Sequence, residues 1–266
     1  MINKFYITGD THGTPILGRL REASQTFRNL NYSFEETALI ILGDAGLNYF
    51  LDERDSNLKQ EVEERGIYIY CVRGNHEARP QDIPTMKLVY DDSVGNGIYM
   101  EDNYPHIRYF VDGGQYTIEN YNVLVIGGAY SVDKYYRLAT GRKWIENEQL
   151  NEDERKMIEH YLIETPQKFD FVFTHTCPSS WQPRDLFIRG LDQSTVDDSM
   201  ERWLDNLKSK IDFRFWCFGH YHEDRIERPG VEMFFTDICP LNEISKHRDI
   251  HTYWWTSRGP NYDKGI

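Results

Sequence analysis

Histidine and aspartate side chains stand close to glycine at several separated places in the sequence. Asp10 and His12 lie two residues apart, and so do His220 and His222. In extended backbone, residues two apart point to the same side, so each pair can approach one metal ion. A neighbouring glycine lets the chain turn tightly and leaves room for an ion close to the backbone. Each pair therefore predicts ligands for a metal.

Further side chains of the same kinds complete a mixed oxygen and nitrogen ligand set. The candidate metal ligands are two carboxylates, one carboxamide and four imidazoles: Asp10, His12, Asp44, Asn75, His175, His220 and His222. Such a set suits Mn, Fe, Zn or Co and is poor for Ca or Mg alone. It is too large for one tetrahedral zinc but suits two ions that share a bridging carboxylate. The expected cofactors are two divalent or trivalent transition metal ions, with Mn, Fe or Zn favoured.

Each motif taken singly has a simpler interpretation. Gly43-Asp44-Ala45-Gly46 is ordinary turn chemistry, Gly74-Asn75-His76 can be a tight turn, and His175 alone is uninformative. However, five of the nine histidines fall in these clusters. The joint pattern favours one metal site over a series of unrelated turns.

Short apolar runs rich in β-branched and aromatic residues indicate buried strands, and five of them end in one of these clusters. The runs are Lys4–Thr8, Ala38–Leu42, Ile67–Val72, Val123–Ile126, Phe169–Thr174 and Arg214–Phe218. Ligands of α/β sheets bind in the crevice outside the carboxyl ends of the strands. The clusters can therefore converge on one site.

Segments of helical periodicity or composition alternate with these strands, which predicts an α/β architecture. The expected helices are Pro15–Leu30, Asp55–Arg65, Asn151–Ile163 and Thr195–Lys208. Two hairpins add antiparallel pairs and so predict mixed sheets. The hairpins join Tyr116–Asn120 to Tyr121–Ile126, and Arg225–Arg228 to Met233–Thr236.

The composition is that of a soluble globular protein: 39% hydrophobic residues, 27% charged residues and a mean hydropathy of -0.66. The formal charge of -13 opposes non-specific binding to nucleic acid or an anionic membrane. A small phosphorylated substrate is therefore expected rather than a long nucleic acid. Bound metal ions would invert the field locally, so a phosphate substrate is not excluded.

The N-terminus enters a strand directly, without a signal-peptide pattern, and no apolar run approaches the length of a membrane span. A cytoplasmic protein is expected. The four cysteines lie far apart without CxxC spacing, which predicts reduced, structural thiols. The polar and aromatic tail, residues 241–266, receives no role.

The ordered series of motifs resembles the calcineurin-like metallophosphoesterases. The motifs are GDxH at Asp10, GDxG at Asp44, GNHE at Asn75, a lone His175 and GHxH at His220. The resemblance implies a four-layer α/β/β/α sandwich with two mixed β-sheets and the site at the strand ends. Because the motifs span most of the chain, it also implies a single domain, residues 1–266.

The resemblance assigns roles to these residues by motif. The implied ligands are Asp10, His12 and His222 for one metal, Asn75, His175 and His220 for the other, and Asp44 as the bridge. A water or hydroxide between the ions would attack the phosphorus of a phosphate mono- or diester. His76 would protonate the leaving oxygen or stabilise the transition state, a task suited to imidazole.

One departure from the family bears on the substrate. Protein Ser/Thr phosphatases of this superfamily carry GDxVDRG at the second motif, where Leu47 and Asn48 replace the Asp and the Arg. A protein phosphatase is therefore disfavoured, and phosphate contacts must come from elsewhere.

The segment after Gly127-Gly128 offers these contacts, because Ser131, Lys134 and Arg137 supply a hydroxyl and two cations. The segment also resembles uncharacterised bacterial and phage-type members of the family. Alternatively, Asp133 and these cations form a solvated helix start.

Two other functions stay open. A nucleic-acid phosphodiesterase or end-processing enzyme predicts a basic groove beside the metals. A non-catalytic metal-binding scaffold is disfavoured, because every ligand position and His76 are filled. The tyrosines and tryptophans are expected in the core or at its rim. Exposed aromatic residues beside the metals would instead favour a base-stacking platform.

Overall fold

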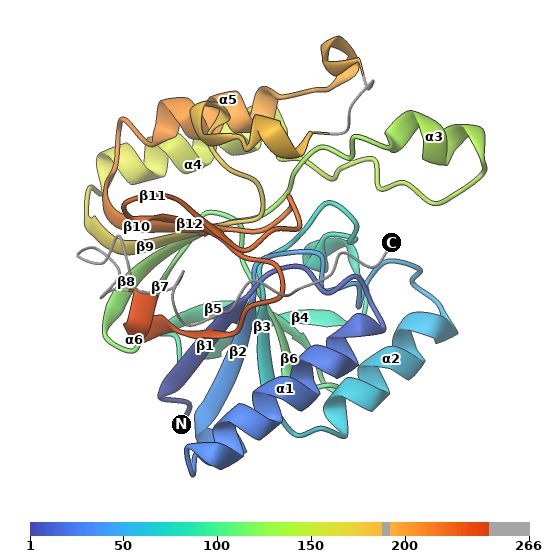
Figure 1. The fold of residues 1–266 in the computed structure, drawn as a ribbon, viewed down its shortest axis with the longest axis vertical. Coiled ribbons are helices and arrows are strands. Elements are labelled where there is room, and N and C mark those ends of the chain that lie inside the picture. Colours follow the sequence, from blue (N-terminus) through green and yellow to red (C-terminus); the bar gives the residue numbers. More distant parts are fainter. Residues whose placement is uncertain (188–191, 245–266) are drawn as a thin grey trace.

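The computed structural model describes residues 1–187 and 192–244. Two β-sheets face each other, and helices cover the outer face of each sheet (Figure 1). The first sheet has the order β13-β1-β2-β3-β6-β5-β4 and the second has the order β11-β12-β10-β9-β8-β7. The predicted four-layer α/β/β/α sandwich with two mixed sheets is confirmed.

Parallel strands form the centre of each sheet, and antiparallel strands lie at the edges. The strands of the first sheet are β1 (Lys4–Thr8), β2 (Thr37–Ile41), β3 (Tyr68–Cys71), β4 (Met86–Asp91), β5 (Asn96–Glu101), β6 (Ile107–Phe110) and β13 (Cys239–Pro240). Those of the second are β7 (Gly114–Ile118), β8 (Tyr121–Ile126), β9 (Lys168–Thr174), β10 (Asp212–Phe218), β11 (Arg225–Arg228) and β12 (Val231–Met233).

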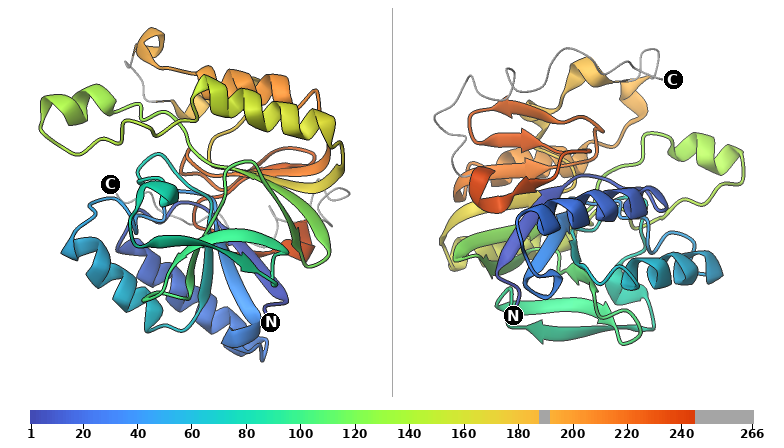
Figure 2. Two further views of the ribbon diagram at one scale, coloured as in Figure 1. Left: turned by 180° about the vertical axis from the view of Figure 1, so that it is seen from behind. Right: turned by 60° about the horizontal axis from the view of Figure 1, so that its bottom comes forward.

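Helices α1, α2, α4 and α5 pack outside the sheets, α6 packs at the side of the layer between them, and α3 lies on an arm that leaves the four layers between β8 and α4 (Figures 1 and 2). The α-helices are α1 (Pro15–Asn29), α2 (Glu53–Glu63), α3 (Lys134–Ala139), α4 (Glu152–Glu164), α5 (Ser199–Leu207) and α6 (Leu241–Ile244). Short 3₁₀ turns are Phe34–Glu36, Pro80–Asp82, Ser179–Trp181, Arg184–Leu186 and Gln193–Thr195.

Three apolar layers hold the sandwich together. The layer between the sheets contains Phe5, Phe171 and Phe173. A second layer lies between the first sheet and α1 and α2, and a third lies between the second sheet and α4 and α5. Since both faces of the central strands are covered, β2 is buried along its whole length.

Local sequence signals explain where the outer helices lie. Helix α1 begins with a proline and buries the stripe Ile16, Leu20, Ala23 and Phe27 at helical spacing. Helix α4 begins with a capping box, in which the Asn151 and Glu154 side chains each bond the other residue's backbone N–H. Both devices fix the helix starts independently of the active site.

The six predicted strands and four predicted helices are all present, with ends shifted by a few residues. The meander β4–β5–β6 was not predicted. The second hairpin differs from the prediction, because β11 pairs with Val231–Met233. The backbone N–H groups of Phe235 and Thr236 instead donate to the Asp224 carboxylate, at 2.7 and 2.9 Å, so a turn follows β12.

The remaining expectations concern the cysteines, membrane spans, the number of domains, the location and the C-terminal tail. All four cysteines are buried and free, as predicted. No helix among the described residues is long and apolar enough to cross a membrane. The single domain and the cytoplasmic location stay predictions. Most of the tail, residues 245–266, lies outside the described residues.

We expect Phe171→Ala to lower the free energy of unfolding by about 3–5 kcal/mol, because Phe171 is fully buried between the sheets. Urea denaturation would measure the change. The control is Leu88→Ala, since Leu88 is 59% exposed. Equal losses in the two variants would contradict the assigned core.

Candidate metal centre

The ligand clusters follow the carboxyl ends of β1, β2 and β3 in one sheet and of β9 and β10 in the other, and they meet at one edge of the sandwich. Four predicted ligands have left-handed backbone: His12, Asp44, His220 and His222 have φ of 47°, 48°, 70° and 56°. This conformation costs free energy in residues other than glycine and is concentrated at functional sites.

Glycines beside the ligands are required for close packing. A Cβ atom on Gly43 would overlap the His175 ring, one on Gly74 would overlap the Asp44 carboxylate, and one on Gly219 would overlap Asp10. The loops of the two sheets therefore approach more closely than any other residue would allow.

Asp10, His12 and His222 form the first group that could hold a metal. The Asp10 Oδ2 atom lies 3.6 Å from His12 Nε2 and 3.3 Å from His222 Nε2, and the two imidazole nitrogens are 2.7 Å apart. Three ligand atoms from two motifs thus surround one point, as expected for a shared ion.

Asp10, Asp44 and His175 form the second group. The His175 Nδ1–H donates to the Leu42 carbonyl at 2.8 Å, which leaves Nε2 free to ligate. His175 Nε2 lies 2.8 Å from Asn75 Oδ1 and 3.6 Å from Asp44 Oδ2. Asp44 Oδ2 also lies 3.7 Å from His12 Nδ1, so this oxygen lies between the two groups.

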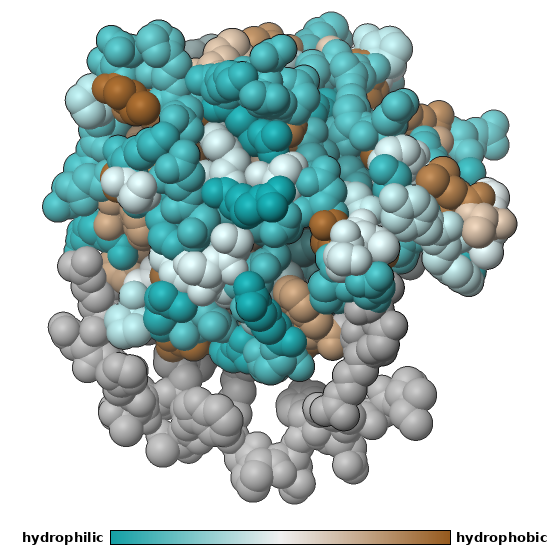
Figure 3. All heavy atoms as spheres, turned by 90° about the horizontal axis from the view of Figure 1, so that it is seen from above, coloured by the Kyte–Doolittle hydropathy of each residue, from teal (hydrophilic) through white to brown (hydrophobic). Residues whose placement is uncertain are grey.

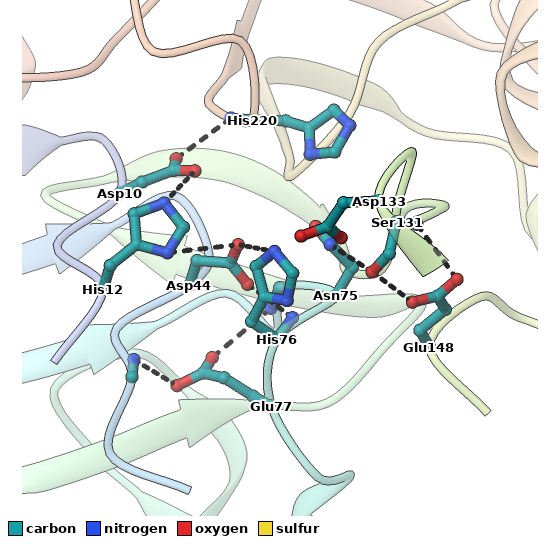
Figure 4. A network of polar contacts seen from close by, with 12 residues as sticks. Asp10, His12, Asp44, Asn75, His76, Glu77, Ser131, Asp133, Glu148 and His220 are labelled. Atoms are coloured by element: carbon teal, nitrogen blue, oxygen red, sulfur yellow. Dashed lines mark hydrogen bonds and ion pairs between the residues drawn. The ribbon is translucent and has the colours of Figure 1, made fainter. Parts of the chain in front are cut away.

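His220 joins the second group through its neighbours. Its ring packs edge-on against the His175 ring, with centroids 4.9 Å apart, and its backbone N–H donates to Asp10 Oδ1 at 3.0 Å. All seven predicted ligands therefore converge, and Figure 4 shows Asp10, His12, Asp44, Asn75 and His220 around one space. How they divide between two ions stays a prediction.

Burial and charge act against each other in these side chains. Burial alone would raise the pKa of the Asp10 carboxyl, but the His175 charge and the neighbouring imidazoles of His12 and His222 lower it well below its usual range. Burial lowers the pKa of His175, yet Asp44 and Asp10 raise it to about 9. Burial and the His175 charge lower the pKa of His220 to about 3. The two carboxylates therefore keep their negative charge.

The arrangement fits transition metal ions. Asp10 Oδ2 is buried and has no hydrogen-bond partner, although a buried carboxylate oxygen without a partner is costly. It points at the ring nitrogens of the first group, and a cation there would satisfy it. The donor set of carboxylate, amide and imidazole suits Mn, Fe or Zn.

His76 lies beside Asp44 at the rim of the metal groups (Figure 4). Its backbone N–H donates to Asp44 Oδ1 at 2.8 Å, and its Nε2 atom lies 4.0 Å from Asp44 Oδ2. Burial lowers the pKa of His76, partly offset by Asp44. The Asp44 side chain therefore lies between the two ligand groups and also fixes the loop that carries His76.

Arg137 reaches the same place from α3. Its guanidinium nitrogen Nη2 lies 3.5 Å from His76 Nε2, while Nε donates to the Asp133 carboxylate at 2.8 Å and Nη1 to the Tyr49 hydroxyl at 2.8 Å. The structure thus brings one predicted substrate-binding cation to the metal centre. Tyr49 has no motif around it, and sequence reasoning missed it.

Ser131 and Lys134, the other two predicted substrate-binding residues, lie differently. The Ser131 side chain is buried, donates to Glu148 and accepts from Asn75 Nδ2 at 2.9 Å, so its hydroxyl orients the Asn75 amide. The Lys134 ammonium lies 4.1 Å from the centre of the Trp144 ring and does not line the cavity at the metal groups. Ser131 lines the cavity at the metal groups, whereas Lys134 does not, and a contact of Ser131 with phosphate stays a prediction.

Two buried glutamates also support the loops, and sequence reasoning assigned them no role. Glu77 accepts from the Gly46 N–H and the Tyr109 hydroxyl, both at 2.9 Å, and burial raises its pKa to about 6. Glu201 accepts from Thr176 Oγ1 at 2.8 Å. Glu77 directly follows the Asn75-His76 motif, whereas nothing in the sequence near Glu201 marks it.

A cavity of about 1310 Å³ opens above the metal groups. Its wall includes His76, Arg137 and the aromatic rings of Tyr49, Phe50 and Phe187. Pockets for small ligands typically measure about 300–1,000 Å³, so the cavity has room for more than a phosphate group.

An α/β/β/α sandwich with an aspartate and histidine metal centre at its strand ends is the structural class of the metallophosphoesterases. The sequence model described as calcineurin-like phosphoesterase matches residues 3–224. The chain belongs to this family, whose members hydrolyse phosphate esters with bound metal ions.

Two similar solved structures come from Thermus thermophilus. One is TT1561, at 13% identity and a TM-score of 0.43, with 89% of this chain and 91% of that chain covered. The other is the sulfate thiohydrolase SoxB in complex with glycerol, at 13% identity and a TM-score of 0.38, with 84% and 37% covered. No curated protein matches the sequence.

We expect Glu201→Gln to stabilise the protein at high pH only. Burial raises the pKa of Glu201 to about 7, above its unfolded value of 4.5. Its contribution to stability is complete below the unfolded pKa and is lost as pH rises through 7. The variant should gain on the order of 3 kcal/mol over the wild type between pH 4.5 and pH 8, measured by urea unfolding with chelator. In the control, Glu61→Gln, an exposed glutamate is changed. A pH-independent difference for Glu201→Gln would count against its buried charge.

Proposed function

We propose that this protein is a dinuclear metal-dependent phosphoesterase that hydrolyses a phosphate mono- or diester, with His76 assisting the leaving group. The observation that carries the proposal is that the Asp10 and Asp44 oxygens lie in two overlapping groups with histidine nitrogens. When bound, two such ions would supply an activated water and neutralise charge on the phosphoryl oxygens.

The chain's own residues hold this site in place. The proposed ligands are Asp10, His12 and His222 for one ion, Asn75, His175 and His220 for the other, and Asp44 for both. Backbone N–H groups of His76 and His220 donate to the carboxylates and orient them. The Ser131 hydroxyl turns the Asn75 amide so that its oxygen faces His175.

His76 is proposed to carry the proton for the leaving oxygen on Nε2. This atom lines the open cavity and contacts only the Arg137 guanidinium and the Asp44 carboxylate among the polar groups described. Imidazole can donate a proton near neutral pH. Burial lowers the pKa of His76, and a bound anionic phosphate beside it would raise that pKa and favour the protonated form. A substrate phosphate at the ions would place its leaving group toward this side of the cavity.

Arg137 is proposed to bind the non-bridging phosphoryl oxygens. Two of its nitrogens donate hydrogen bonds to Asp133 and Tyr49, so Nη2 is presented at His76 in a fixed orientation. Arg73 is not an alternative, because it is buried and its bonds go to Asp112 and the Glu148 carbonyl. This assignment supplies the phosphate contact absent from the second motif.

Removal and restoration of metal tests the proposed chemistry. Chelator-treated protein should not cleave p-nitrophenyl phosphate or bis(p-nitrophenyl) phosphate, and added Mn²⁺ should restore cleavage of at least one. His76→Ala should lower the restored kcat by about 10²–10⁴-fold, with unchanged Mn²⁺ content. The control is His160→Ala, an exposed histidine on α4. Full activity in His76→Ala would remove its proposed role, and activity in chelator would contradict metal dependence.

Substitution of Arg137 tests phosphate binding. Arg137→Ala should lower kcat/KM by about 10–100-fold, because one charge-assisted contact is worth about 1.5–3 kcal/mol. Arg137→Lys should recover only part, since a lysine cannot keep the fork held by Asp133 and Tyr49. The exposed Arg65, changed to Ala, is the control. Unchanged kcat/KM in Arg137→Ala would exclude the contact.

A further inference from the structure

The arm that carries α3 has a local charge opposite to that of the whole protein. We call residues 134–144 the basic arm. It contains Lys134, Arg137, Arg142 and Lys143 and no Asp or Glu, whereas the chain carries a formal charge of -13. At physiological salt, charges more than about 8–10 Å away are largely screened. A ligand in contact with the arm therefore responds to the positive charges of the arm more than to the net charge of the chain.

Three of these cations are held mainly by neutral groups. Lys134 lies over the Trp144 ring at 4.1 Å, and Arg142 lies over the Tyr136 ring at 5.2 Å. Lys143 donates to the Phe50 carbonyl at 3.1 Å. None of the three forms an ion pair within the part of the chain that the structure describes. Lys134 and Lys143 interact electrostatically with the Glu148 and Asp52 carboxylates, but without a close ion pair, so an anionic ligand can compete for these charges.

The arm also exposes aromatic faces. Tyr135 is 61% exposed and Tyr136 is 54% exposed. In the space-filling view the right edge, where Figure 1 places α3, mixes apolar side chains with paler, more polar ones (Figure 3). Exposed aromatic residues interleaved with cations are the surface on which unpaired bases stack while phosphates are neutralised.

The basic arm starts at the metal centre. Arg137, in the middle of α3, lies 3.5 Å from His76, and Tyr130 under the Lys134 ammonium lines the cavity. A chain of phosphates that enters the cavity would therefore continue along the arm. This continuity distinguishes the arm from an unrelated basic patch.

We propose that the substrate is a single-stranded nucleic acid, with one phosphodiester at the metal centre and neighbouring nucleotides on the basic arm. The proposal rests on the proposed phosphoesterase function. A single strand is required because the bases of a duplex cannot stack on Tyr135 or Tyr136. Water attacks the phosphorus, the bond to one ester oxygen breaks, that oxygen takes a proton, and a phosphomonoester and a hydroxyl end result. This substrate differs from the small one expected from the net charge.

The decisive measurement is oligonucleotide binding to the full chain in chelator, which does not depend on catalysis. Fluorescence anisotropy with labelled oligo-dT of about 15 nucleotides should detect binding that weakens as NaCl rises from about 50 to about 200 mM. Tyr135→Ala combined with Tyr136→Ala should weaken binding about tenfold or more. Lys134→Gln, Arg142→Gln and Lys143→Gln together should reduce the salt slope by about 2.

The matched control is Lys156→Gln combined with Tyr161→Ala, which removes an exposed cation and an exposed tyrosine from α4 and should leave binding unchanged. Urea unfolding should give equal stability for all variants. Absence of binding at low salt, binding that the arm variants leave intact, or preference for anionic phospholipid vesicles over oligo-dT would overturn the proposal.

The two proposals fail separately. Arm variants loaded with Mn²⁺ should keep cleavage of bis(p-nitrophenyl) phosphate and lose cleavage of oligo-dT. If the wild type cleaves the small ester but does not bind oligo-dT, the nucleic-acid proposal is wrong and the phosphoesterase stands. If it binds oligo-dT through the arm but cleaves no ester with any transition metal, the proposed hydrolysis is wrong.

Discussion

Two buried carboxylates that lie close together set the main constraint on this protein. Asp10 and Asp44 are each about 1% exposed, and both belong to one group of potential ligands. Like charges this close are unfavourable unless cations lie between or beside them. In the metal-free chain the protonated His175 supplies part of that charge. Metal ions would supply it fully, and their binding would release the proton from His175.

The two sheets of the sandwich together bring the candidate ligands to one place. The first sheet supplies Asp10, Asp44 and Asn75, and the second supplies His175 and His220. Neither sheet alone carries a complete ligand set, so the apolar layer between them also fixes the distance between the two halves of the site. Gly43, Gly74 and Gly219 then permit contacts that a side chain would block. The apolar layer between the two sheets therefore contributes both to the stability of the fold and to the geometry of the ligands.

The ligands and the central strands were predictable because their signals are local. An apolar run followed by Gly-Asp or Gly-His marks both a buried strand and its functional end. The β4–β5–β6 meander was missed because none of its strands shows a long apolar run. The edge strand Met86–Asp91 has no buried residue, and Ile107–Phe110 is largely buried but only four residues long. Short or half-exposed strands carry a weaker signal.

Contacts between distant residues could not be predicted. Ser131 was expected at the phosphate, but Glu148, 17 residues further on, takes its hydroxyl. Tyr49 holds Arg137 across 88 residues, and no motif surrounds it. The net charge favours a small substrate, and this stays a prediction, because a sum over the sequence ignores position. The four cations of residues 134–144 are neighbours in the sequence, but only the fold shows that their arm lies beside the site.

The location of bound metal tests the central claim most directly. Crystals of the Mn²⁺-loaded protein, measured at the manganese absorption edge, should show two anomalous peaks about 3.5–4 Å apart. One peak should lie against Asp10, His12 and His222, the other against Asn75 and His175, and Asp44 should reach both. A single peak, or peaks away from these residues, would contradict the dinuclear centre.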